Sequence, residues 1–514
     1  MSKLITRGAP QPATVPPAAG LAGESRLATR AEALATRRNG ARLLAFVSAV
    51  SLGIFLFRPT YPNYDSYYSL VWGRALSHGH LPDYDVFRTP TPHPLWELLG
   101  AGLSFFGGAA DRLLVLITIA SFIGLLVVLF RFAQHLLGTL IALVGVAVVC
   151  TRADLIFYAL RGMVDVPFLL LVFGAALWEL KSPRRGLPVL VLLGLAGLLR
   201  PEAWVLSGVY LLWLWPAISR EQFIRYALLV AAAPLLWIAS DWIVTGHPLH
   251  SLTSTRDVAG QFGRDRSVPE AVRLIPDYVG ANEKIVNVAA GGLGLLLALW
   301  MLRRRAYLPL ALMAVGIGVF LMIAIAGLSV IPRYLVIPSL LFNLGVGVAL
   351  AGWAVITDRR ARRVAIGVAA LSLLLVMWRT PAWINDFRKL NGQTLFVKKQ
   401  HQGLKAILQD PSVTALMAKC RPITFPTHSA LPVVEWETGL GKHDLQASIN
   451  QTGPPTHGLL FLGSSFNFEP AAARSVTGVN QKSARKWWSN YPLSAFKFVA
   501  GNSMWRVYAN CPGA

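Results

Sequence analysis

Charged residues are scarce in this chain. Asp, Glu, Lys and Arg make up 14% of its 514 residues, whereas 54% of the residues are hydrophobic, and the mean hydropathy is +0.51. An ordinary soluble domain has about 25% charged residues, so the composition excludes that class. The chain is predicted to be a polytopic α-helical membrane protein.

Cysteine is nearly absent. The three cysteines are Cys150, Cys420 and Cys511, and no spacing typical of a metal site links them. Cys150 ends an apolar run and is expected to be inert. The other two lie in the polar C-terminal third, and they can form a disulfide if that part lies outside the cytoplasm.

Acidic residues are the scarcer of the two charged classes. The chain has 25 Asp and Glu against 48 Lys and Arg, which gives a net charge of +23. Such an excess can indicate nucleic-acid binding, but many of the cations lie in short clusters between apolar runs, as membrane topology requires. The expected partner is therefore the lipid bilayer and no nucleic acid.

The apolar runs define the predicted membrane module. Residues 1–40 are rich in Ala, Pro, Ser and Arg and are expected to form a disordered cytoplasmic tail. No small-residue cleavage site follows the run at 41–57, so we interpret it as a retained first span. About eleven spans are predicted, near 41–57, 112–131, 136–150, 165–180, 187–199, 203–217, 226–244, 286–301, 307–329, 333–356 and 364–378.

Basic clusters predict the orientation of these spans. If the N-terminus is cytoplasmic, the clusters "KSPRR", "SREQFIR", "LRRR" and "DRRARR" all fall on the cytoplasmic side. The large loop 58–111, the loops 151–164 and 245–285, and everything after residue 379 then fall outside. Residues 95–108 are too short and glycine-interrupted for a span, and we expect an amphipathic helix at the outer interface.

The character of the chain changes after Arg379. The membrane module is predicted to cover residues 41–378, and residues 379–514 are predicted to form a small extracytoplasmic α/β domain. The stretches "ITFPTH", "LPVVEWET", "GLLFLGSSF" and "FKFVAGNSMWRVYA" are expected to be strands. In the last of these, "GNS" predicts the turn of a hairpin.

The large outer loop carries the first candidate for chemistry. Asp65 follows the first span within a few residues and is flanked by tyrosines in "PNYDSYY". A carboxylate close to the membrane surface can accept a proton from a hydroxyl nucleophile or bind a divalent ion. Alternatively, Asp65 only caps the following helix.

Further along the same loop, "LPDYDVF" contains Asp83 and Asp85, and "TPTPHPLW" contains His93. Asp83 is expected in a solvent-exposed turn, and Asp85 is a second carboxylate candidate. The prolines around His93 predict a rigid, extended segment. His93 can bind substrate or ligate an ion, although a lone histidine is more often structural.

Two arginines are predicted at the outer boundary of the spans. "LLRPEAW" places Arg200 and Glu202 there, and "SVIPRYLVIP" adds Arg333 and Tyr334. A Pro-initiated helix with Glu in its first turn, and an arginine that extends to the interface, account for these positions structurally. Two arginines on one boundary also suit a lipid phosphate, which Arg binds through paired hydrogen bonds.

The loop "TGHPLHSLTSTRDVAGQFGRDRS" adds three polar candidates. His247, His250 and Arg256 lie in it without a fixed metal-ligand spacing. The glycine and hydroxyl content of the loop predicts a mobile segment that covers a substrate.

The order of these motifs resembles that of the GT-C superfamily of integral-membrane glycosyltransferases. The first-loop aspartate, "TPTPHPLW", "LLRPEAW", "TGHPLHSLTSTR" and "PRYLVIP" carry the resemblance, which covers about residues 41–378. Members of this family include aminoarabinose, mannosyl and arabinofuranosyl transferases. They take a sugar from a polyprenyl-phosphate carrier and pass it to an acceptor outside the cytoplasm.

The resemblance implies specific roles. Asp65 matches the first-loop acid that acts as a base or a metal ligand, and Asp165 in "RGMVDVP" matches a second acid. Arg200 and Arg333 would stabilise the departing lipid phosphate, and Tyr64, Tyr67 and Trp72 would line a sugar pocket. The family commonly has paired acids where this chain has only Asp65, which weakens the case for a bound Mg²⁺ or Mn²⁺ ion.

Sugar transfer to a glycan, lipid or protein of the cell envelope, with inversion, is therefore the leading hypothesis. A transporter or flippase for a lipid-linked saccharide is an alternative, but the sequence has no internal repeat and no matched pair of broken helices. A non-catalytic envelope assembly protein, which binds a partner through its C-terminal domain, is the other alternative.

Overall fold

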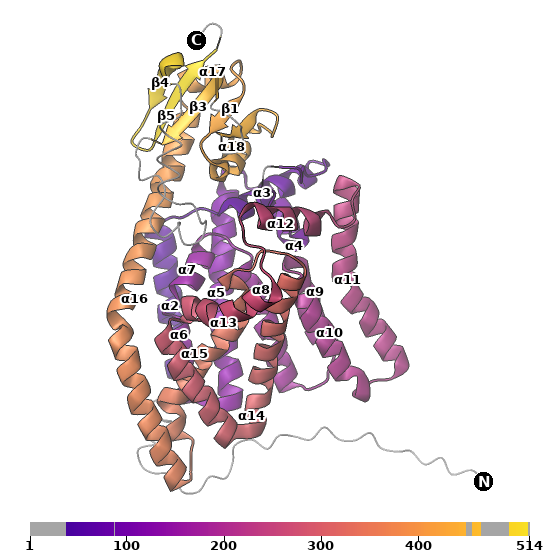
Figure 1. Ribbon diagram of the computed structural model, residues 1–514, viewed down its shortest axis with the longest axis vertical. Helices are drawn as coiled ribbons and strands as arrows, with labels where there is room; N and C mark the ends of the chain where they lie inside the picture. The colour runs from indigo at the N-terminus through magenta and orange to yellow at the C-terminus, as the bar shows by residue number, and fades with distance from the viewer. Residues whose placement is uncertain (1–36, 87, 449–454, 464–492, 512–514) are drawn as a thin grey trace, which may run out of the picture.

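The computed structural model describes residues 37–86, 88–448, 455–463 and 493–511. A bundle of helices carries a small sheet domain at the end where the C-terminus lies (Figure 1). Most of the tail that was predicted to be disordered, residues 1–36, lies outside the described residues. Residues 37–40 of that tail already belong to the first described helix.

Three of the helices, α3, α4 and α12, lie beneath the sheet domain (Figure 1). The first half of the chain forms α2 (Arg37–Phe57), α3 (Tyr64–Ser77), α4 (Pro94–Ser104), α5 (Ala110–Leu137), α6 (Thr139–Val149), α7 (Ala153–Leu160), α8 (Asp165–Lys181), α9 (Leu187–Leu199), α10 (Glu202–Leu214) and α11 (Arg220–Thr245). The second half forms α12 (His250–Gln261), α13 (Val268–Glu283), α14 (Ile285–Ile325), the 3₁₀ turn η3 (Pro332–Leu335), α15 (Val336–Ala351), α16 (Arg359–Leu408), α17 (Pro411–Met417) and α18 (Leu431–Thr438).

Several helices are long and apolar enough to cross a membrane. Among the described residues there are 6, or up to 8 if each of two sharply bent helix pairs counts as one span. The predicted number of eleven is therefore not confirmed. Three of the predicted spans form α8, α9 and α10, which have 17, 13 and 13 residues and fall below the length that crosses a bilayer in a single helix.

The predicted spans 286–301 and 307–329 lie mainly within α14, but the chain reverses between them. In the first half, Gly291 approaches Phe342 and Gly294 approaches Gly345 of α15, so this half runs parallel to α15. In the second half, Gly316 packs on Pro338, and residues 306–310 line a cavity with residues 341–348, so this half runs antiparallel. The two halves therefore form a hairpin that packs on α15.

The C-terminal domain is built on a five-stranded sheet in the order β2-β1-β3-β5-β4. Its strands are β1 (Ile423–Phe425), β2 (Leu445–Ala447), β3 (Gly458–Gly463), β4 (Lys497–Gly501) and β5 (Trp505–Asn510). Strand β1 is parallel to β2 and β3, whereas β5 is antiparallel to both β3 and β4. The predicted hairpin at the end of the chain is therefore confirmed.

One predicted strand is wrong. "LPVVEWET" forms the helix α18, with a proline in its first turn and Gly439 in the left-handed conformation (φ 74°) at its end. These are ordinary start and stop signals of a helix. The run of apolar residues is buried on all sides rather than on alternate sides, so its pattern alone did not distinguish helix from strand. Strand β2, which has three residues, was not predicted.

The sheet domain is attached to the bundle through α3 and α16. Arg74 of α3 donates hydrogen bonds to the backbone oxygens of Trp436 (2.7 Å) and Glu435 (2.9 Å). Helix α16 continues past the predicted domain boundary at residue 379, as far as Leu408. Cys420 and Cys511 form a disulfide within the domain.

The predicted interfacial helix 95–108 corresponds to α4, which packs closely on α3. A Cβ atom on Gly100 would lie 2.3 Å from the backbone oxygen of Ser69, and one on Gly73 would lie 2.4 Å from the backbone nitrogen of Ala101. Glycine is therefore required where the two helices touch. On the other side of α4, Leu98 and Phe105 are exposed, as expected for an amphipathic helix.

Candidate active site

The first turn of α3 places Asp65 beside the turn that leads into α8. The backbone N–H of Asn63 donates to the Arg161 oxygen (2.8 Å), and the Ser66 hydroxyl donates to the Gly162 oxygen (2.7 Å). Asn63 is also the helix cap, because its side-chain oxygen accepts from the Ser66 N–H (3.0 Å). Asp65 is therefore not the capping residue, and the capping role does not account for its carboxylate.

Asp165 meets Arg200 because α8 and α9 form an antiparallel hairpin. Asp165 is the first residue of α8, and Arg200 directly follows the last residue of α9. The Arg200 guanidinium forms an ion pair with Asp165, and its Nε donates to Glu202 Oε1 (3.0 Å). All three side chains are buried, so two carboxylates compensate the charge of one arginine.

Beside this group lies a small pocket with a cavity volume of about 20 Å³. Arg333 and Tyr334, from the turn η3, complete its polar lining next to Asp165, Arg200 and Glu202. The Tyr334 ring centre lies 4.9 Å from the Arg200 guanidinium and 5.6 Å from that of Arg333. The remaining lining residues are Phe168, Leu169, Leu206, Gly316, Val319, Val336 and Ile337.

Arg333 differs from Arg200 in its partners. Among the described residues, no hydrogen bond or ion pair engages the Arg333 side chain, and its Nε is buried. Asp165 Oδ2 and Glu202 Oε2 are also buried without a hydrogen-bond partner in the described part of the chain. Buried polar atoms of this kind are costly unless a ligand or water satisfies them. Arg333 Nε needs an acceptor, whereas the two carboxylate oxygens need donors, so the pocket is suited to a ligand that carries both acceptor oxygens and hydroxyl groups.

Asp65 belongs to the same electrostatic environment. Burial raises the pKa of Asp65, and Arg333 and Arg264 partly oppose this effect, while the nearby charge of Asp165 adds to it. A carboxylate with a raised pKa is a better proton acceptor than an exposed one. The sequence motifs around Asp65, Asp165, Arg200 and Arg333 therefore converge on one region.

His93 also lies near this region. Burial, together with the charges of Arg200 and Arg333, lowers its pKa to about 3, so the ring is neutral at pH 7. Its Nδ1 is buried without a hydrogen-bond partner among the described residues. The backbone N–H of His93 donates to Glu97 Oε1 (3.0 Å), which fixes the start of α4.

Asp85 lies elsewhere. Its side chain is 92% exposed, and it pairs with Lys442 of the sheet domain (3.3 Å), as does Asp83 (2.9 Å). Lys442 therefore connects the large loop to the sheet domain, and Asp85 is not part of the pocket.

The predicted mobile loop is largely helical, because it forms α12 and α13. His250 and Arg256 lie on α12 and do not line the pocket. The His250 ring stacks loosely on Tyr84, with ring centres 6.3 Å apart, and Arg256 packs over Gly327. His247 is exposed in the turn before α12.

The three aromatic residues predicted to line a sugar pocket have different environments. Tyr67 and Trp72 are buried; Tyr67 donates to Asp111 (2.9 Å), and Trp72 donates to the Asp83 oxygen (2.8 Å). Tyr64 is only partly buried, and its ring lies 4.9 Å from that of His428 of the sheet domain. His428 and Arg264 approach this region without any local motif in the sequence that predicts it.

The donor set does not fit a resident metal ion. In the described ranges no three His, Cys, Asp or Glu side chains gather as metal ligands. The charge of Asp165 raises the pKa of Asp65, so the two carboxylates interact, but one oxygen of Asp165 is already paired with Arg200. We therefore derive no chemical step through a metal.

Comparison with solved structures identifies the fold. No protein-family model and no curated protein sequence matches the chain. The crystal structure of ArnT from Cupriavidus metallidurans bound to undecaprenyl phosphate matches 93% of this chain and 99% of its own, with a TM-score of 0.52 and 13% identity. The oligosaccharyltransferase of Archaeoglobus fulgidus in its apo form matches 92% of this chain and 74% of its own, with a TM-score of 0.51 and 11% identity.

Both neighbours are GT-C glycosyltransferases. The resemblance seen in the sequence is therefore confirmed at the level of the fold, which this chain shares with them over nearly its whole length.

Proposed function

We propose that the protein transfers a sugar from a polyprenyl-phosphate carrier to a cell-envelope acceptor on the outer face of the cytoplasmic membrane. The observation that carries the proposal is Arg333, whose side chain has no hydrogen bond or ion pair among the described residues and lies in a largely apolar pocket beside a buried carboxylate group. Arginine without a protein partner is well suited to a phosphate. The fold shared with ArnT, whose structure contains undecaprenyl phosphate, supports the same ligand class.

In the proposed reaction, the acceptor hydroxyl gives its proton to Asp65, and its oxygen attacks the anomeric carbon. The bond between that carbon and the phosphate oxygen breaks, and its electron pair leaves with the lipid phosphate. Arg333 stabilises the negative charge that develops on the leaving oxygen. Attack from the face opposite the phosphate inverts the configuration of the sugar.

Arg200 has a different proposed role. Its charge is shared between Asp165 and Glu202, so it contributes little net charge to a phosphate. We assign it to holding Asp165 at the pocket wall. His93, neutral at this position, can accept a hydrogen bond from a sugar hydroxyl through Nδ1.

The test is sugar transfer in detergent from a panel of polyprenyl-phosphate sugars. Wild type should transfer at least one sugar, and Arg333→Gln should lower the rate by about a hundredfold, the usual effect of removing one charge-stabilising donor. Arg256→Gln, which removes an exposed arginine of α12 outside the pocket, is the matched control and should behave as wild type. The assay is run with divalent ions added and with a chelator.

The alternatives give different results in the same experiment. Folded wild type that moves a lipid-linked saccharide across vesicles but never transfers its sugar would be a transporter. Protein that does neither, while Arg333→Gln keeps the cellular phenotype, would be an assembly protein. Either result would refute the proposed reaction.

The proposed orientation has its own test. The "DRRARR" segment lies where α16 begins, at the end of the bundle opposite the sheet domain (Figure 1), as expected if the sheet domain is outside. In a Cys150→Ser background, Asp85→Cys should react with a membrane-impermeant maleimide on intact spheroplasts. Arg363→Cys should react only after permeabilisation, and the reverse pattern would invert the topology.

A further inference from the structure

Arg333 follows a short segment whose backbone is hydrogen-bonded to α13 and to a residue shortly before that helix. The backbone N–H of Val330 donates to the Arg264 oxygen (2.9 Å), and the Tyr278 hydroxyl donates to the Val330 oxygen (3.1 Å). Asn282 then donates through Nδ2 to the oxygen of Pro332 (2.8 Å), the residue directly before Arg333. Tyr278 and Asn282 both belong to α13.

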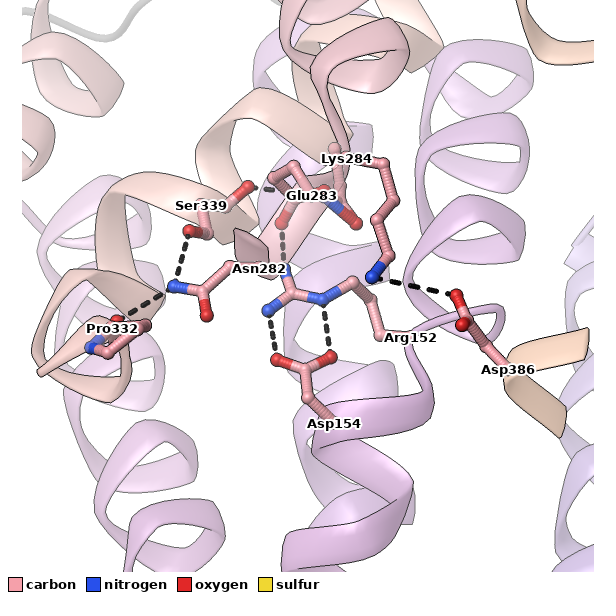
Figure 2. A network of polar contacts seen from close by, with 9 residues as sticks. Arg152, Asp154, Asn282, Glu283, Lys284, Pro332, Ser339 and Asp386 are labelled. Atoms are coloured by element: carbon pink, nitrogen blue, oxygen red, sulfur yellow. Dashed lines mark hydrogen bonds and ion pairs between the residues drawn. The ribbon is translucent and has the colours of Figure 1, made fainter. Parts of the chain in front are cut away.

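Asn282 also contacts α15, the helix that follows Arg333. Its Nδ2 lies 3.3 Å from the hydroxyl oxygen of Ser339 in the first turn of α15, and Figure 2 shows the amide between Pro332 and Ser339. One side-chain amide therefore bridges the residue before Arg333 and the helix that follows it.

The next residue along α13 is anchored in a buried polar network. Glu283 is 1% exposed and pairs with Arg152, which precedes α7 (Figure 2). It also accepts a hydrogen bond from Asn343 of α15. Arg152 also binds Asp154 through Nε (2.8 Å). Burying ionisable residues costs free energy, so buried ionisable residues usually have a function. The reaction proposed above does not use these residues.

The network lies at a sharp bend of the chain. The axis turns by 102° between α13 and α14, and Lys284 at the bend has a positive φ of 66°, which is unusual for a residue with a side chain. Lys284 also approaches Asp386 of α16 (3.6 Å). The end of α13 is thus fixed against α7, α15 and α16 immediately beside Asn282.

We infer that Asn282 is a positioning residue for Arg333, and that the Arg152–Glu283–Asn343 network holds Asn282 in place. This inference rests on the proposed function of Arg333 as the phosphate ligand. No hydrogen bond or ion pair orients the Arg333 side chain within the described residues, so its placement depends largely on the backbone that carries it. A binding group must be held within about 0.5 Å of its productive position, and Asn282 holds the backbone oxygen of Pro332 before Arg333 and the side chain of Ser339 after it.

The test measures binding of polyprenyl phosphate to the purified full-length protein in detergent. Asn282→Ala should weaken binding by about three- to tenfold, the effect of one neutral hydrogen bond. Asn287→Ala is the matched control, because Asn287 is a buried asparagine of the adjoining helix turn with no hydrogen bond to residues 330–333 in the described structure. It should bind as wild type does.

A double-mutant cycle separates positioning from general destabilisation. If Asn282 acts through Arg333, adding Asn282→Ala to Arg333→Gln should weaken binding no further. Additive losses, or wild-type binding by Asn282→Ala, would overturn the inference.

Binding and transfer distinguish this inference from the proposed function. If wild type binds polyprenyl phosphate and the cycle is non-additive but no donor supports transfer, the inference holds and the proposed reaction fails. If folded wild type does not bind polyprenyl phosphate, both are overturned.

Discussion

Asp65→Asn is expected to lower the rate of sugar transfer by about two to four orders of magnitude, the usual contribution of a general base. Asparagine keeps the size of the side chain but cannot accept the proton of the acceptor hydroxyl. Because Asn63, and not Asp65, caps α3, the helix should form normally in the variant. Single-turnover transfer and the dissociation constant of the donor, measured on the same preparation, check the prediction: the rate should fall and donor binding should change little.

Asp85→Asn is the matched control for Asp65→Asn. Asp85 lies in the same large loop but is exposed and paired with Lys442, so its loss should leave the rate unchanged. Retained transfer in Asp65→Asn would remove Asp65 from the mechanism and make the unpartnered oxygen of Asp165 the next candidate for the base.

The pH dependence of the transfer rate is a second test of Asp65 as the general base. Burial raises the pKa of Asp65 above that of an exposed aspartate, and only the ionised form can accept a proton. The rate in wild type should therefore fall as the pH drops through this raised pKa and should level off above it. The residual rate of Asp65→Asn should lack this step.

The fold was predictable where apolar length and charge clusters determine it. The apolar runs correspond to helices, and the change of character after Arg379 leads to a sheet whose last hairpin follows from "GNS". The number of spans was not predictable, because α8, α9 and α10 are shorter than a bilayer and bury their faces against other helices. The strand predicted for "LPVVEWET" was wrong for a related reason. Burial on every side removes the hydrophobic periodicity that distinguishes a helix from a strand.

The types of residue at the site could be predicted from the sequence, but the contacts that each residue makes were harder to predict. Motifs indicated Asp65, Arg200 and Arg333, and the structure brings their neighbourhoods together. The roles of the two arginines could not be distinguished from the sequence, because only the folded chain shows that Arg200 has two carboxylate partners. Asn282 belongs to no motif, because its importance depends on a backbone oxygen 50 residues away.

Arg200→Ala should be strongly destabilising, unlike the loss of Arg333. It would leave the buried carboxylates of Asp165 and Glu202 without their cation, and breaking a buried ion pair on one side costs about 3–5 kcal/mol in the free energy of unfolding. Thermal unfolding in detergent should show a clear drop in the melting temperature. Arg225→Ala, which removes the exposed partner of Glu221 on α11, should unfold as wild type does, because exposed ion pairs contribute little.

Removing all three charges distinguishes this cause from a simple loss of packing. In the variant that combines Arg200→Leu, Asp165→Asn and Glu202→Gln, none of these three residues carries a charge, so much of the lost stability should return. If the triple variant is as unstable as Arg200→Ala, packing of the arginine side chain and not its charge is responsible. Recovered stability without recovered transfer would show that the reaction, unlike folding, requires the charges of this group.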